Sequence, residues 1–183
     1  MTHIVTTIAG ITVPSTDPLF LSIVALHVPL GLMAAVAGVV AMLSPKRLGR
    51  HPVWGTVYFW SLTGAFATAS ALSFIRWLAD YPLFVLGALS WLAAWIGRRA
   101  RRRRVQHWAR LHIAAMGYSY VLLLTAFYVD NGKRLPLWRD LPVWSYWTLP
   151  AIIGTPIILW ALFRHPLVKE YAKSSPAAIR DSP

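Results

Sequence analysis

The chain has 183 residues, of which 57% are hydrophobic and 13% are charged, whereas a typical soluble domain carries about 25% charged residues. This hydrophobicity excludes an intrinsically disordered chain, and the length of the apolar runs argues against a soluble globule. The absence of cysteine excludes disulfides, thiolate metal sites, iron–sulfur clusters and cysteine nucleophiles.

Two apolar runs occupy the first part of the chain. Residues 1–18 are a Thr-rich lead without Lys or Arg, in which we expect no cleaved targeting segment. Residues 19–43 carry no charge and exceed the roughly 20 residues that a helix needs to cross a bilayer. Pro45 and Pro52 are helix breakers, and the second run extends from Trp54 to near Arg76.

Three further runs follow. After a short turn at residues 80–82, the third run covers residues 81–97 and leads into the most basic stretch, residues 98–110. The fourth run covers residues 108–129. A polar loop separates it from the fifth, residues 144–163, in which Pro150 and Pro156 indicate a kinked or partly broken helix. The sequence therefore predicts an all-α, polytopic membrane protein with five transmembrane helices within residues 19–166, followed by a polar tail at 167–183.

The distribution of positive charge predicts the orientation. If the N-terminus lies outside, 14 of the 18 Lys and Arg residues lie on the inner side, and the outer side holds Arg76, Lys133, Arg134 and Arg139. Inner loops of membrane proteins are enriched in Lys and Arg. We therefore expect an extracytoplasmic N-terminus and a cytoplasmic C-terminus.

Six arginines dominate the basic stretch: Arg98, Arg99, Arg101, Arg102, Arg103 and Arg104. Such a cluster anchors the orientation at the cytoplasmic surface and attracts anionic lipid headgroups, and the two roles are compatible. The formal net charge of +12 would suggest nucleic acid in a soluble protein. No base-reading element accompanies it here, so we expect no nucleic-acid partner.

His27 is an ionisable residue inside the first run. At about 100° per residue, Gly31, Ala34, Ala35 and Gly38 all lie within about 80° of it, so His27 heads a stripe of small residues. Small residues face neighbouring helices, and we expect His27 to point into the bundle. It is either a hydrogen-bonding residue that specifies packing or a functional group, as intramembrane ionisable residues often are.

The inner-face histidines are the candidate cofactor ligands, since imidazole binds haem and metals. Four of them lie near the predicted inner face: His51, His107, His112 and His165. His51 and His112 are the candidate cofactor-binding residues, with haem as the cofactor to consider. His107 and His112 lie about 140° apart on one helix, and no carboxylate lies within the runs, so we expect no metal site. No catalytic set is recognisable.

Three segments resemble a family of uncharacterised bacterial multi-pass membrane proteins, a predicted membrane domain of unknown function. They are HPVWGTVYFW at 51–60, LHIAAMGYSYVLLLTAFYVDNGKRLPLW at 111–138 and PAIIGTPIILWALFRHP ending at 166. The resemblance covers residues 20–166, and His27, His51 and His112 match positions where such proteins also have histidine. It implies a multi-span architecture and leaves the activity open.

We also predict a polar layer at the depth of His27. Counting about eight residues inward from the outer end of each run reaches His27 in the first run. In the other four it reaches small or hydroxyl-bearing residues: Ser70, Ser90, Ser119, Tyr120, Gly154 and Thr155. We expect His27 to hydrogen-bond to one of these hydroxyls, with kinks at Pro29 and Pro156 opening a small cavity.

Three classes of function stay open. The first is a non-enzymatic protein, either transport-related or an accessory component of a larger membrane assembly or oligomer. The scarcity of polar groups inside the bundle favours this class. The second is a redox protein that holds haem through the inner-face histidines or quinone between helices. The third is an enzyme acting on lipid, for which the sequence offers no nucleophile, so whether the protein is an enzyme is left open.

Overall fold

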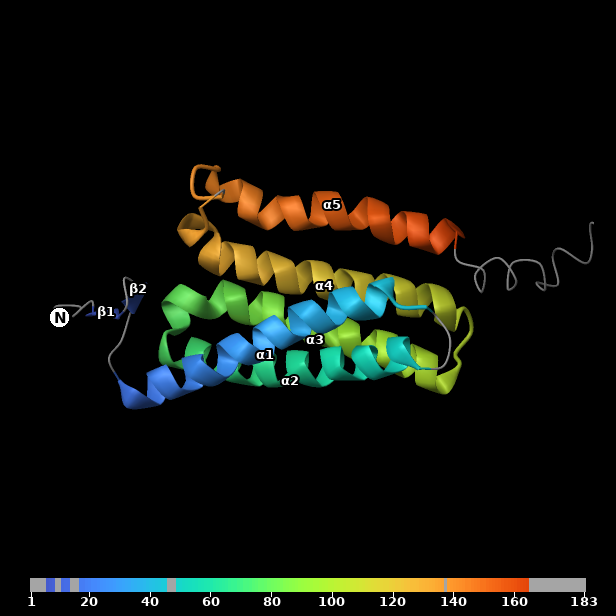
Figure 1. Cartoon of the computed structure of the whole chain (residues 1–183), viewed down its shortest axis with the longest axis horizontal. Coiled ribbons are helices and arrows are strands. Elements are labelled where there is room, and N and C mark those ends of the chain that lie inside the picture. The colour runs from blue at the N-terminus through green and yellow to red at the C-terminus, as the bar shows by residue number, and fades with distance from the viewer. Residues whose placement is uncertain (1–5, 9–10, 14–16, 46–48, 137, 165–183) are drawn as a thin grey trace, which may run out of the picture. The chain divides into compact units, whose positions relative to one another are not determined.

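The structure, a computed structural model, describes residues 6–8, 11–13, 17–45, 49–136 and 138–164. Its elements in chain order are β1 (Thr6–Ile8), β2 (Ile11–Val13), α1 (Pro18–Leu43), α2 (Arg50–Ile75), α3 (Trp77–Arg103), α4 (Trp108–Asn131), the 3-10 helix η1 (Gly132–Arg134) and α5 (Val143–Arg164) (Figure 1). The two strands pair antiparallel, with Thr6 opposite Val13, a hairpin that the sequence did not predict. The polar tail, with His165, lies outside the described residues.

Four of the five α-helices are long and apolar enough to cross a membrane: α1, α3, α4 with its 3-10 extension, and α5. A helical membrane protein, as the apolar runs predicted, is thereby supported. α2 has 26 residues, as many as α1, but small polar residues dilute its apolar stretch: Ser61, Thr63, Thr68, Ser70 and Ser73. These residues bring hydrogen-bonding groups into α2.

Two of the predicted helix boundaries are wrong. α2 begins at Arg50 instead of Trp54, and Pro52 lies in its first turn, where a backbone N–H has no helical partner and proline is tolerated. The break before α3 lies at Arg76 instead of residues 80–82. Asp80 therefore falls in the first turn of α3 and Pro82 shortly after it.

The basic stretch is helical over most of its length, which the sequence analysis did not anticipate. α3 continues through Arg103, and the connection to α4 is confined to residues 104–107. Arg104 and His107 adopt left-handed φ angles of 48° and 56° in this turn. Arginine has a high helix propensity, and cations in the last turn interact favourably with the negative end of the helix dipole. The helix therefore extends beyond the end of the apolar run.

The expectation that the fifth helix is partly broken is wrong, whereas a kink at its prolines stays a prediction. α5 is continuous from Val143 to Arg164 with Pro150 and Pro156 inside it, and α1 is continuous through Pro29. Each proline removes one backbone hydrogen bond. Helices in membranes tolerate this loss where neighbouring groups satisfy the freed carbonyl.

The chain divides into two compact units, residues 1–84 and 85–183, and α3 contributes its first two turns to the first unit. In this unit α1 and α2 run antiparallel, side by side (Figure 1). α1 buries a row of small residues, Ala34, Ala37, Gly38 and Ala41. Such a row allows the close approach of two helix backbones.

In the second unit, α4 and α5 interlock through two glycines. A Cβ atom at Gly117 of α4 would lie 2.6 Å from Cγ1 of Ile158 on α5, and one at Gly154 of α5 would collide with Val121 on α4. On each helix the glycine and the branched residue are one turn apart. Each branched side chain therefore fills the space beside the other helix's glycine, and the antiparallel register follows.

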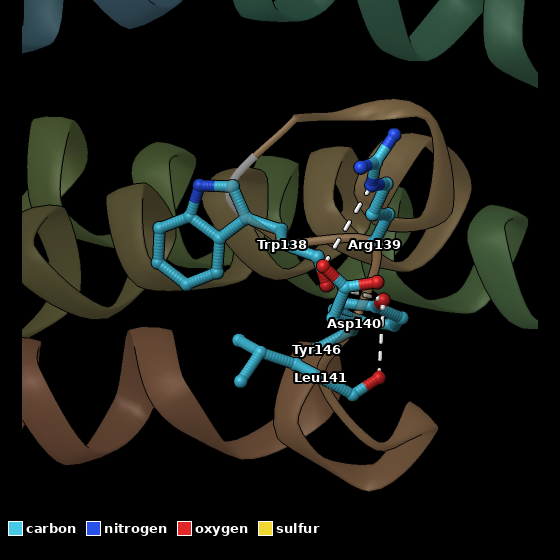
Figure 2. A network of polar contacts seen from close by, with 5 residues as sticks. All are labelled: Trp138, Arg139, Asp140, Leu141 and Tyr146. Atoms are coloured by element: carbon cyan, nitrogen blue, oxygen red, sulfur yellow. Dashed lines mark hydrogen bonds and ion pairs between the residues drawn. The ribbon is translucent and has the colours of Figure 1, made fainter.

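Tyr146, in the first turns of α5, closes the loop between α4 and α5. Its hydroxyl donates to the carbonyl oxygens of Trp138 (2.8 Å) and Leu141 (3.3 Å) (Figure 2). Its ring packs beside Gly132, where a Cβ atom would lie 2.6 Å from two ring carbons. The ring of Trp138 in turn lies 4.7 Å from that of Tyr128, centroid to centroid. This polar loop is thus a folded cap on one end of the second unit.

Candidate functional site

His27 is an ionisable side chain well inside α1, about 14 Å along the helix from Pro18 at about 1.5 Å per residue. Its ring is half-buried. The Nδ1 atom lies 2.9 Å from Oγ1 of Thr68 and 3.1 Å from the carbonyl oxygen of Ala65, both on α2. His27 therefore faces the neighbouring helix of its own unit.

The partners of His27 determine where its ring carries a proton. The Thr68 hydroxyl has one proton, which it donates toward the carbonyl oxygens of Gly64 and Ala65, each 2.9 Å away. Its oxygen is therefore an acceptor toward the imidazole, as is the Ala65 carbonyl. Nδ1 of His27 therefore carries a proton shared between these two acceptors.

The close approach of α1 and α2 makes this contact possible. A Cβ atom at Gly64 would lie 3.0 Å from Cδ1 of Leu30, so a larger residue would displace the leucine. Leu30 is one turn from His27 on α1, and Gly64 is one turn from Thr68 on α2. The small residues of α2 thus bring its backbone within reach of the imidazole.

Two residues of the predicted polar layer meet in the second unit. Oγ of Ser90 on α3 donates to the carbonyl oxygen of Ser119 on α4 at 2.8 Å and lies 3.5 Å from the Ser119 hydroxyl. Both serines are 0% exposed. Because both serines are shielded from solvent, this hydrogen bond ties α3 to α4 inside the apolar region.

The other residues of the layer are placed differently. Ser70 donates to the carbonyl oxygen of Phe66 in its own helix at 2.8 Å, and the hydroxyl beside His27 belongs to Thr68, two residues earlier. Tyr120 and Thr155 are half-buried in α4 and α5. A layer that includes residues of both units stays a prediction, as does the cavity at Pro29 and Pro156.

His51 and His112 repeat the contact that His27 makes. Nδ1 of His51, in the first turn of α2, lies 2.8 Å from the carbonyl oxygen of Ala41 in α1. Nδ1 of His112 on α4 lies 2.9 Å from the carbonyl oxygen of Gly97 on α3. A carbonyl oxygen only accepts, so both rings carry a proton at Nδ1 and, when neutral, a lone pair at Nε2.

Arginine–tryptophan pairs gather at one end of the second unit, where α3 ends, α4 begins and α5 ends. Each guanidinium lies over an indole ring: Arg99 over Trp95 at 5.1 Å, Arg104 over Trp108 at 5.0 Å and Arg164 over Trp160 at 5.8 Å. Stacking of this kind is a favourable cation–π contact, and tryptophan prefers the headgroup level of a bilayer. This end of the unit is therefore suited to the membrane surface.

The sequence did not single out Thr68, Gly64 or the carbonyl of Gly97. A signal for the first two was present, because Gly64, Ala65 and Thr68 form a patch of small residues on α2 like that on α1. The Gly97 carbonyl had no signal, since every residue carries one and only the pairing of α3 with α4 selects it.

No family model, curated protein or solved structure matches the chain. Among the residues that the structure describes, no three His, Cys, Asp or Glu side chains form a group that could hold a metal ion. The function is therefore inferred from the geometry of the helix pairs.

Proposed function

We propose that this chain is a five-span protein of the bacterial inner membrane with a non-enzymatic, transport-related or accessory role. Its N-terminus is outside and its C-terminus is in the cytoplasm. The observation that carries this role is the contact of His27 with Thr68 and Ala65, in which an ionisable ring well inside α1 is held to α2 by its Nδ1 proton. Such groups are costly in a membrane and mark proton, ion or substrate pathways.

The register of α1 and α2 supports five crossings over four. Contacts between the two helices run in antiparallel order: His51 with Ala41, Gly64 with Leu30 and Thr68 with His27. α2 therefore runs back along most of the length of α1. An odd number of crossings also keeps 14 of the 18 Lys and Arg residues on one side, as the positive-inside rule favours.

Proton flux into proteoliposomes tests the role of His27. With a pH-sensitive dye trapped inside and a pH gradient imposed, we expect wild-type vesicles to lose the gradient faster than protein-free vesicles. His27→Ala and His27→Gln should both abolish most of this difference, because neither side chain exchanges a proton. His51→Ala is the matched control, since it removes a histidine with the same type of contact at the end of the helix pair.

Two results would contradict this proposal. Wild-type vesicles that hold the gradient as long as protein-free vesicles would exclude a proton-linked transport role. Full flux in His27→Gln, which keeps a hydrogen-bonding side chain, would make His27 a packing residue.

A redox role is the second candidate, and the orientation of His51 and His112 favours it. A haem iron binds a neutral imidazole nitrogen, and ligating histidines commonly donate the other ring N–H to a carbonyl or carboxylate. Both rings donate Nδ1–H to a backbone carbonyl (2.8 and 2.9 Å), so Nε2 is the nitrogen with ligand chemistry. Haem bound there would supply one-electron transfer.

The absorption spectrum of protein purified from native membranes decides between the candidates. A redox role predicts a haem band that is lost in His51→Ala or His112→Ala and kept in His107→Ala, whose histidine is exposed at the start of α4. A spectrum without a haem band would exclude haem and leave quinone as the only redox cofactor of this candidate.

A further inference from the structure

We propose that one face of α3 binds the phosphate of an anionic phospholipid at the membrane surface. The face, called here the arginine stripe, consists of Trp95, Arg98, Arg99 and Arg102. It is a lateral site on the second unit, on the side of α3 that faces away from α4. This inference rests on the membrane character of α3 and not on the transport-related role of His27.

The helical course of the basic stretch creates the stripe. At about 100° per residue, the four residues fall within an arc of about 100°. Gly97, on which Met116 and Ala115 of α4 pack, lies about 150° from the centre of that arc. The stripe therefore points away from α4, and Trp95 is 40% exposed.

The chemistry of the stripe matches a phosphodiester. Arg98 and Arg102 are one turn apart, and Arg99 is oriented by its contact with the Trp95 ring at 5.1 Å. A guanidinium presents a planar fork of donors that binds phosphate through two hydrogen bonds. The tryptophan ring prefers the headgroup level, where the phosphates of the lipid also lie.

The sequence around the stripe lacks a compensating charge. No Asp or Glu occurs between Tyr81 and Val129, a range that includes most of α3 and α4. Like charges one turn apart repel each other, and a bound anion would relieve that repulsion.

Stabilisation of the helix dipole explains only part of the basic cluster. That effect is confined to the last turn of a helix, which here holds Arg101, Arg102 and Arg103. Arg98 and Arg99 lie one turn earlier, beside Trp95. There they are placed to contact a phosphate at the side of the helix.

Native mass spectrometry of the full-length protein with added lipid tests the stripe. We expect the wild type to retain phosphatidylglycerol in preference to phosphatidylcholine. The triple variant Arg98→Gln, Arg99→Gln, Arg102→Gln should weaken phosphatidylglycerol retention roughly tenfold or more, from the strength of basic residues at anionic surfaces. The control Arg103→Gln, Arg104→Gln, Arg110→Gln removes equal charge from the same end but outside the stripe. It should weaken retention several-fold less than the stripe variant, because only the diffuse attraction of the surface for anionic lipid is reduced.

Equal losses in the two triple variants would overturn the proposal, because they would show diffuse attraction without a built site. Displacement of the lipid by millimolar inorganic phosphate would also overturn it, since the ligand would then be a free anion. If the glutamine variant unfolds, Trp95 provides a separate readout. The emission of Trp95 is the difference between the fluorescence of the wild type and that of Trp95→Phe. Brominated phosphatidylglycerol should quench this emission more strongly than brominated phosphatidylcholine does. Equal quenching by the two lipids would contradict a headgroup site.

Discussion

Gly154→Val should destabilise the second unit by about 1–3 kcal/mol or more, the usual cost of overpacking. The added side chain would collide with Val121 of α4, whose position is set by the opposing contact of Gly117 with Ile158. The helices would have to separate or slide, which also strains the second contact. Thermal unfolding followed by intrinsic tryptophan fluorescence measures the loss.

A reciprocal exchange separates this mechanism from a general intolerance of valine. In the double variant Gly154→Val, Val121→Gly, the branched side chain stands on α5 and the glycine that makes room for it stands on α4. The collision is thereby removed, so much of the lost stability should return. Gly31→Val is the matched control, because a Cβ atom at Gly31 meets nothing within 4 Å. A Gly154→Val protein that unfolds at the same temperature as the control would contradict the interlocked register.

Single cysteines should label in an all-or-none pattern that reports the orientation. The chain has no cysteine, so the background is absent. Four exposed positions lie in or beside the connections: Pro45 after α1, Ala79 in the first turn of α3, Gln106 before α4 and Lys133 in η1. In intact cells an impermeant thiol reagent should label Ala79→Cys and Lys133→Cys. Pro45→Cys and Gln106→Cys should label only after the membrane is permeabilised, because the positive charge keeps those connections inside.

The same four variants report whether α2 crosses. If α2 stayed on one side, Ala79→Cys and Pro45→Cys would share an accessibility, and the pattern at Gln106 and Lys133 would be reversed. Labelling of Pro45→Cys and Gln106→Cys alone in intact cells would instead invert the orientation with all five crossings kept.

The candidate site was only partly predictable from the sequence. The stripe of small residues on α1 indicated that His27 points toward another helix, and its contact with α2 has that direction. The depth count pointed to Ser70, whereas the hydroxyl beside His27 belongs to Thr68. Two residues along a helix change the azimuth by about 200°, so a depth estimate alone cannot select the residue that faces a partner.

The apolar and helical nature of the segments was determined by the sequence itself, because a span is a local property of about 20 consecutive residues. Tertiary structure decided which polar atoms meet. The carbonyls of Ala65, Ala41 and Gly97 became acceptors for histidine only through the register of two antiparallel helices. That register depends on close approach at glycines such as Gly64 and Gly154, and the complementary side chains are distant along the chain. The extension of α3 beyond its apolar run, which arranges Arg98, Arg99 and Arg102 on one face, likewise emerged only in the folded helix.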